Sequence, residues 1–171
     1  MAVREIITEG NVTLRKHTRE VTVFDKKLWT LLDDMKDTLA FADGVGLAAP
    51  QIGILRRIFV IDVGDGKGVI EFINPKILSF CGTQTGLEGC LSVPGKHAIV
   101  TRPNEVMVKA LDRNGVEFEK TMTELGARAV FHENDHLDGI LFIDKADKKL
   151  TDDELEEYLE KEADKEEKTK K

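Results

Sequence analysis

The segment His132-Glu133-Asn134-Asp135-His136 constrains the fold more than any other part of the chain. Residues i and i+4 lie on the same face of an α-helix, so this spacing aims both imidazole rings at one point. Imidazole nitrogens bind borderline divalent cations such as zinc or iron, and a glutamate after the first histidine can accept a proton from a nearby water. The segment therefore predicts a helix that presents a metal site suited to hydrolytic chemistry.

The residues around this motif predict a buried helix. Thr123 is a suitable N-cap and Gly139 a suitable C-terminal stop. Between them, apolar or histidine side chains recur every three or four positions, which is the spacing of one helical face. These residues are Leu125, Ala129, His132 and His136. Two core histidines without partners would cost free energy, so they either bind a metal or form hydrogen bonds with other core groups. We favour the metal.

Strand patterns precede this helix. Two pairs of apolar runs are separated by turn dipeptides: 57–63 and 69–74 by Asp65-Gly66, and 105–111 and 116–120 by Asn114-Gly115. Asp-Gly and Asn-Gly favour tight hairpins, which predict antiparallel pairing. The expected fold class is therefore α+β, with antiparallel sheets and hairpins packed around a central helix that carries the metal motif.

With 171 residues, 41% of them hydrophobic and 33% charged, the chain fits one compact domain with a solvated end. We place the folded domain at residues 1–147, including a helix over residues 26–42 that Asp25 caps. Residues 148–171 are expected to form a charged C-terminal helix, capped by Thr151, and a partly disordered tail.

The formal net charge of -7 argues against DNA or an anionic membrane as a partner. No apolar run approaches the roughly 18 residues of a membrane span, and residues 1–10 lack the apolar core of a signal peptide. The cytoplasm is the expected compartment.

Residues 44–49 formally match the glycine pattern of a dinucleotide-binding turn. Such a turn needs a preceding strand and a following helix, whereas here a helical pattern precedes and Pro50 follows. Glycines also let a second backbone approach closely, and the amide of Gln51 can donate a hydrogen bond to an oxygen. A peptide-facing loop is the better interpretation.

The two cysteines are too few for a disulfide scaffold. Cys90 lies on extended backbone just before Val93-Pro94-Gly95, which we interpret as a turn. A thiolate is a strong third ligand for zinc or iron, and three protein ligands leave a position open for water, as catalytic sites require. Cys81, at the end of an apolar run, is expected to be a small buried residue.

Three segments together resemble peptide deformylases: the loop ending in Ala-Ala-Pro-Gln at residues 48–51, Glu-Gly-Cys-Leu-Ser at 88–92, and the histidine motif at 132–136 with aspartate before its last residue. They occur in that family's order. The resemblance extends from Leu14 to about Asp144, which would make residues 1–147 the catalytic domain. The short chain is similar to the type 1, bacterial or organellar, form.

The resemblance implies a hydrolase that removes the N-terminal formyl group from formylmethionine of nascent polypeptides and releases formate. The base would be Glu133, and the developing oxyanion would be held by a bound metal, the backbone N–H of Leu91 and the side-chain amide of Gln51. One divalent metal is implied, Fe2+ in the cell with Zn2+, Ni2+ or Co2+ as substitutes, and its ligands would be Cys90, His132 and His136.

The resemblance also implies how substrate binds. Backbone groups of Val45, Gly46 and Gly89 would pair with the N-formylmethionyl nascent peptide as an added strand. The methionine side chain would enter an apolar pocket near Ala129 and His132. Some members dock on ribosomes through a basic C-terminal helix, and the acidic run at 152–157 gives a transient ribosome contact of that kind little support.

Three residues depart from the family's usual pattern. Phe131 stands where glutamine is common, Asn134 where an apolar residue is usual, and His97 where some members have arginine near the substrate mouth. None is a ligand or the base, so we expect activity to survive while pocket size and peptide contacts change. Asp135 is expected to brace the helix or a hydrogen bond behind a ligand.

Two other functions use the same histidine motif. A metallopeptidase would need a third ligand downstream, for which Glu154 and Glu157 are the candidates. A structural zinc module would be closed by Cys81 as the fourth ligand and would give Glu133 no role.

Overall fold

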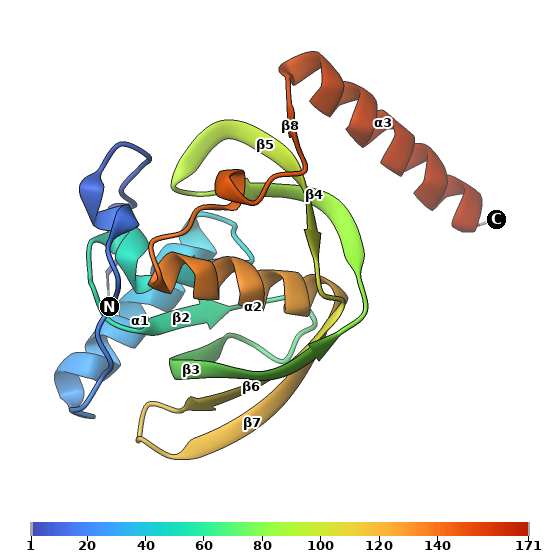
Figure 1. The fold of residues 1–171 in the computed structure, drawn as a ribbon. Coiled ribbons are helices and arrows are strands. Elements are labelled where there is room, and N and C mark those ends of the chain that lie inside the picture. Colours follow the sequence, from blue (N-terminus) through green and yellow to red (C-terminus); the bar gives the residue numbers. More distant parts are fainter. Residues whose placement is uncertain (1, 171) are drawn as a thin grey trace.

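The computed structural model describes residues 2–170 and places one helix at the centre of the molecule (Figure 1). This helix, α2 (Glu124–Leu137), carries the histidine motif. It packs against β1, β2, β6 and β7 of a five-stranded sheet and against β5 of a three-stranded sheet. The strands are β1 (Gly46–Ala48), β2 (Ile58–Ile61), β3 (Ile70–Cys81), β4 (Gln84–Cys90), β5 (Val93–Arg102), β6 (Glu105–Leu111), β7 (Glu117–Thr123) and β8 (Lys148–Leu150). The predicted α+β class is confirmed.

The larger sheet has the order β1-β2-β3-β6-β7, and every neighbouring pair is antiparallel. The antiparallel pairing of both predicted hairpins is therefore confirmed, although residues 62–69 connect β2 to β3 in place of the tight turn expected at Asp65-Gly66. Strand β3 continues beyond its predicted end at Asn74, which has a φ of 50° and starts an irregularity in the pairing with β6. Its side-chain amide exchanges two hydrogen bonds of 2.8 Å with the backbone of Val21, and this compensates for the break in the ladder.

The predicted helix over residues 26–42 is observed as α1 (Lys26–Phe41). The Asp25 carboxylate accepts a hydrogen bond of 3.0 Å from the Leu28 N–H and so caps the helix as expected. Buried leucines and Met35 form the stripe that packs with β2 in one apolar cluster. The helix is scaffold, and the loop after it delivers residues 44–46 to the site.

The smaller sheet has the order β4-β5-β8 and corrects two predictions. Val93-Pro94-Gly95 is not a turn, because Leu91 and Ser92 make the turn and Val93 begins β5, opposite Cys90. Pro94 is tolerated there because the start of a strand is one of the places where a missing N–H costs little. Residues 148–150, which we assigned to the tail, form β8 and pair with β5.

The last helix, α3 (Asp152–Thr169), extends away from the body (Figure 1). The predicted cap is confirmed, because Thr151 and Glu154 exchange side-chain to backbone hydrogen bonds of 3.3 and 3.0 Å. No residue of α3 is buried, and fraying of its end in solution stays a prediction. Among residues 2–170, no helix combines the length and apolar character that crossing a membrane requires.

Candidate active site

Three metal-ligating side chains converge beside α2. Cys90 ends β4, while His132 and His136 lie one turn apart on α2, and the three ligand atoms lie within 4.8 Å of one another. The Cys90 Sγ is 3.3 Å from the His136 Nε2. A thiol and two imidazoles with no fourth ligating side chain in the described part suit iron or zinc in an open, catalytic type of site.

The two competing ligand sets do not form. Cys81 is exposed at the end of β3, with its Sγ 3.8 Å from a carboxylate oxygen of Glu105, so its predicted burial is wrong. It lies outside the ligand group, which removes the closed zinc module. Glu154 pairs with Lys148 and Glu157 with a lysine of the same helix, so neither supplies the third ligand of a metallopeptidase.

Glu88 orients the first histidine, a role that our reading of the sequence missed. Its Oε2 lies 3.0 Å from the His132 Nδ1, which leaves the Nε2 as the free ligand atom. Burial opposes ionisation of Glu88, but hydrogen bonds from His132 and Arg102 outweigh it and hold its pKa far below the usual range. The sequence did hold a signal for this role: side chains two positions apart on a strand lie on the same face, so Glu88 lies on the same face as Cys90.

A buried network of charges stands behind these residues. Arg102 donates to Glu88 from Nε and Nη2, at 2.9 and 3.1 Å, and to Asp135 from Nη1 at 2.6 Å. Arg128 donates to Glu88 from Nη1 at 2.7 Å. Asp135 therefore braces α2 through Arg102, which resolves the role left open for it.

We predict that Glu88→Gln lowers metal affinity about 10- to 100-fold, since carboxylates that hydrogen-bond to the second ring nitrogen of a ligating histidine carry effects of that size. The amide keeps the shape of the side chain but loses its charge. Competition with a chromogenic chelator measures the affinity, with Glu20→Gln at an exposed position as the matched control. An affinity equal to that of the parent would contradict the orienting role.

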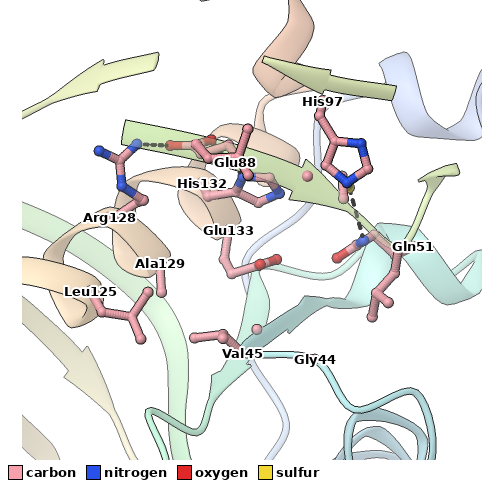
Figure 2. A pocket seen from close by; sticks show the side chains of 15 residues that line it. Gly44, Val45, Gln51, Glu88, His97, Leu125, Arg128, Ala129, His132 and Glu133 are labelled. Atoms are coloured by element: carbon pink, nitrogen blue, oxygen red, sulfur yellow. Dashed lines mark hydrogen bonds and ion pairs between the residues drawn. The ribbon is translucent and has the colours of Figure 1, made fainter. Parts of the chain in front are cut away.

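Glu133 lies next to the ligand group and faces the glycine loop (Figure 2). Its side chain is buried, and its Oε2 has no hydrogen-bond partner among the described residues. Burial raises its pKa to about 7, against the lowering effect of the nearby His132. A Cβ on Gly46 would lie 2.5 Å from the Glu133 Oε1, so only glycine lets β1 approach this carboxylate. Such a group is suited to exchange protons near neutral pH.

The Gln51 side chain is held in one orientation. Its Oε1 accepts a hydrogen bond of 2.8 Å from the Ala48 N–H, so the amide group points the other way. There the Nε2 donates to the Ser92 Oγ at 3.2 Å and to the Cys90 Sγ at 3.6 Å. The short 3-10 helix Ala49–Ile52 that follows β1 makes this geometry possible. A preorganised donor thus lies beside the ligand group.

A cavity of about 380 Å3 opens onto these groups. All the predicted substrate-contacting residues line it: Val45, Gly46, Gly89, His97 and Ala129. The cavity lies between residues of β1 and β4, which are edge strands of the two sheets. The Val45 carbonyl accepts the Asp62 N–H at 2.8 Å and keeps its second lone pair for another donor. The site is therefore shaped for an extended chain.

The three departures from the family pattern have different surroundings. Phe131 packs edge-on against Phe80, with ring centroids 5.8 Å apart, and like Asn134 it does not line the cavity. His97 does line it, with its ring close against Gly89: a Cβ on that glycine would lie 3.1 Å from the His97 Cδ2. Only His97 is therefore placed to alter peptide contacts directly.

The family model of polypeptide deformylase matches residues 3–152. The chain belongs to this family. It is 55% identical over 149 residues to the peptide deformylase of Clostridium botulinum, covering 87% of this chain and 100% of that one. It is 52% identical over 155 residues to peptide deformylase 1 of Bacillus subtilis, covering 91% of this chain and 97% of that one.

Solved deformylase structures share the fold. The crystal structure of a peptide deformylase from Legionella pneumophila matches with a TM-score of 0.82 and 44% identity, over 95% of this chain and 98% of that one. The Thermotoga maritima enzyme matches with a TM-score of 0.82 and 39% identity, over 85% of this chain and 99% of that one. The resemblance predicted from the three motifs is thereby confirmed, and the deformylase match includes β8.

Proposed function

We propose that this chain removes the formyl group from the N-terminal formylmethionine of nascent polypeptides. The observation that carries the proposal is the meeting of Cys90, His132 and His136 with the unpartnered carboxylate of Glu133, in a cavity between two strand edges. A linear formyl amide at the end of an extended chain fits this combination.

The ligand group would hold one divalent metal ion, which we propose to be Fe2+ in the cell, with Zn2+, Ni2+ and Co2+ able to replace it. When bound, the ion supplies Lewis acidity that activates water and polarises a carbonyl oxygen. The thiolate and two imidazoles are ligands that several first-row ions accept, so availability decides among them.

The chain's own residues would divide the remaining work. Glu133 accepts a proton from the attacking water while the water oxygen bonds to the formyl carbon. The Gln51 Nε2 and the Leu91 N–H stabilise the negative charge that develops on the formyl oxygen. The carbon–nitrogen bond then breaks, and Glu133 delivers its proton to the departing amine. The products are formate and a free amino terminus.

Substrate would be held by backbone groups on both sides of the cavity. Val45 and Gly46 at β1 and Gly89 on β4 offer backbone N–H and C=O groups to the peptide, which would bind as an added strand. Such pairing does not depend on the peptide's side chains after the first residue. The first side chain would enter the space beside Ala129. This division supports a broad range of sequences after the formylated residue.

The test is formate release from formyl-Met-Ala-Ser by anaerobically purified, metal-loaded protein. Acetyl-Met-Ala-Ser is the matched control peptide, since it has the same side chains and a bulkier acyl group. We expect formate from the first peptide and no acetate from the second, with activity lost on chelation and regained on metal addition. No formate from a folded, metal-loaded protein would overturn the proposal.

We predict that Gln51→Leu lowers kcat about 10²- to 10³-fold while the protein keeps its metal, as expected for the loss of one oxyanion donor. The substitution conserves size and removes the Nε2. Steady-state formate release and metal analysis check this. Unchanged kcat would exclude Gln51 from this role, and loss of metal would assign it to support of Cys90 instead.

The proposed substrate places the enzyme in the cytoplasm, where nascent chains emerge, with neither DNA nor membrane as a partner. Contact with the ribosome would be transient. Residues 152–171 contain ten carboxylates and five lysines, so they carry five of the seven net negative charges. A helix of this charge does not favour binding to ribosomal RNA.

A further inference from the structure

Arg128 occupies an unusual position for a guanidinium. Its side chain is only 10% exposed, yet it lines the substrate cavity together with Leu125 and Ala129 of the same helix (Figure 2). Those neighbours are apolar. A charged group on the wall of the space beside Ala129 would therefore act directly on the first side chain of a bound peptide.

Only one nitrogen of the Arg128 guanidinium, Nη1, forms hydrogen bonds with other described residues. The Nη1 donates to the Glu88 Oε1 at 2.7 Å and to the Val100 carbonyl at 3.1 Å. A guanidinium has five N–H donors, and those on Nη2 and Nε have no hydrogen-bond partner among the described residues. The fully buried unpartnered side-chain atoms in the described part are Glu133 Oε2 and His136 Nδ1, so the Nη2 and Nε of this cavity-lining side chain are not fully enclosed by protein atoms.

The neighbouring strand makes room for this group. A Cβ on Gly86 would lie 3.2 Å from the Arg128 Nη2, so a larger residue there would press on the guanidinium. Glycine at this point of β4 and the two acceptors of Nη1 together set the position of the remaining donors. The donors are thus preorganised before any ligand arrives.

We propose that Arg128 is a specificity-determining residue for the formylated amino acid. Its free N–H donors favour a side chain that ends in a hydrogen-bond acceptor over an alkyl chain of equal length. The thioether of methionine is a weak acceptor, and the sulfoxide of oxidised methionine is a strong one. An alkyl chain would displace water from the donors without supplying a hydrogen-bond acceptor, so the donors would be left unpaired. This inference rests on the proposed deformylase function and deepens it.

The experiment compares three peptides that differ only in the first residue: formyl-methionine, formyl-norleucine and formyl-methionine sulfoxide, each followed by Ala-Ser. For the parent we expect kcat/KM about three- to ten-fold higher for methionine than for norleucine, the equivalent of one modest hydrogen bond. In Arg128→Leu the ratio should fall to about one. The ratio of kcat/KM for the sulfoxide peptide to that for the norleucine peptide should be about ten-fold or more lower in Arg128→Leu than in the parent.

Ratios within one variant separate specificity from general damage, which matters because Arg128 also supports Glu88. Leu125→Ala is the matched control on the same face of α2: it enlarges the cavity without removing a donor, so the methionine preference should persist. Arg128→Lys keeps the charge but loses the planar fork, and we expect an intermediate ratio.

Equal kcat/KM for methionine and norleucine in the parent, or a ratio that Arg128→Leu leaves unchanged, would overturn this inference while leaving the deformylase function intact. Absence of formate from all three peptides with metal-loaded parent would instead overturn the proposed function. If Arg128→Leu does not fold, the parent ratio and the Arg128→Lys ratio still decide the question.

Discussion

Replacing Glu133 with glutamine is expected to lower kcat for formate release about 10²- to 10⁴-fold, the usual range for a general base. The variant keeps the size of the side chain and its contact with Gly46. Because the proposed metal ligands are other residues, metal content should equal that of the parent. Formate assays at saturating peptide and metal analysis of the same samples provide the measurement.

The pH profile gives this prediction a second test. Burial raises the pKa of Glu133 to about 7, so kcat/KM of the parent should fall as the pH drops through that region and the carboxylate gains a proton. Glutamine cannot titrate, so the residual activity of the variant should lose this limb. A variant with parental kcat would remove Glu133 from the mechanism.

The second large effect concerns stability. Arg102→Met is expected to lower the free energy of unfolding by about 3 to 5 kcal/mol, because it removes the buried cation that two buried carboxylates share. Those carboxylates are Glu88 and Asp135, and the arginine side chain that serves them is only 3% exposed. Urea unfolding of parent and variant at the same metal concentration measures the difference.

Arg19→Met is the matched control for this measurement. Arg19 is exposed and forms no ion pair with another residue in the described part of the chain, so the change in stability should stay within about 0.5 kcal/mol. A loss of less than about 1 kcal/mol for Arg102→Met would mean that the buried network contributes little beyond an apolar core.

The hairpins and the two main helices were predictable because their signals are local. Asn114-Gly115 specifies its turn within two residues, and Asp25 caps α1 three residues from the N–H that it bonds. The metal helix was equally clear, because its two histidines are four residues apart. Each of these features depends on neighbours in sequence, which the sequence displays directly.

The features that were missed depend on distant partners. β8 is a three-residue edge strand whose sequence resembles the charged tail that follows it. Only its pairing with β5 makes it a strand. Arg102 and Arg128 meet Glu88 across 14 and 40 positions, with no periodicity to mark them. Their contacts follow from how the smaller sheet packs on α2, which local propensity does not encode.

The ligand group also has a mechanical consequence for the whole chain. Cys90 and His136 are 46 positions apart, on a strand of one sheet and on the central helix, so a bound ion would act as a staple across the interface between them. A ligand that binds the folded chain and not the unfolded one stabilises it in proportion to the logarithm of its concentration. The supply of metal in the cell would then set how long each molecule lasts as well as how fast it works.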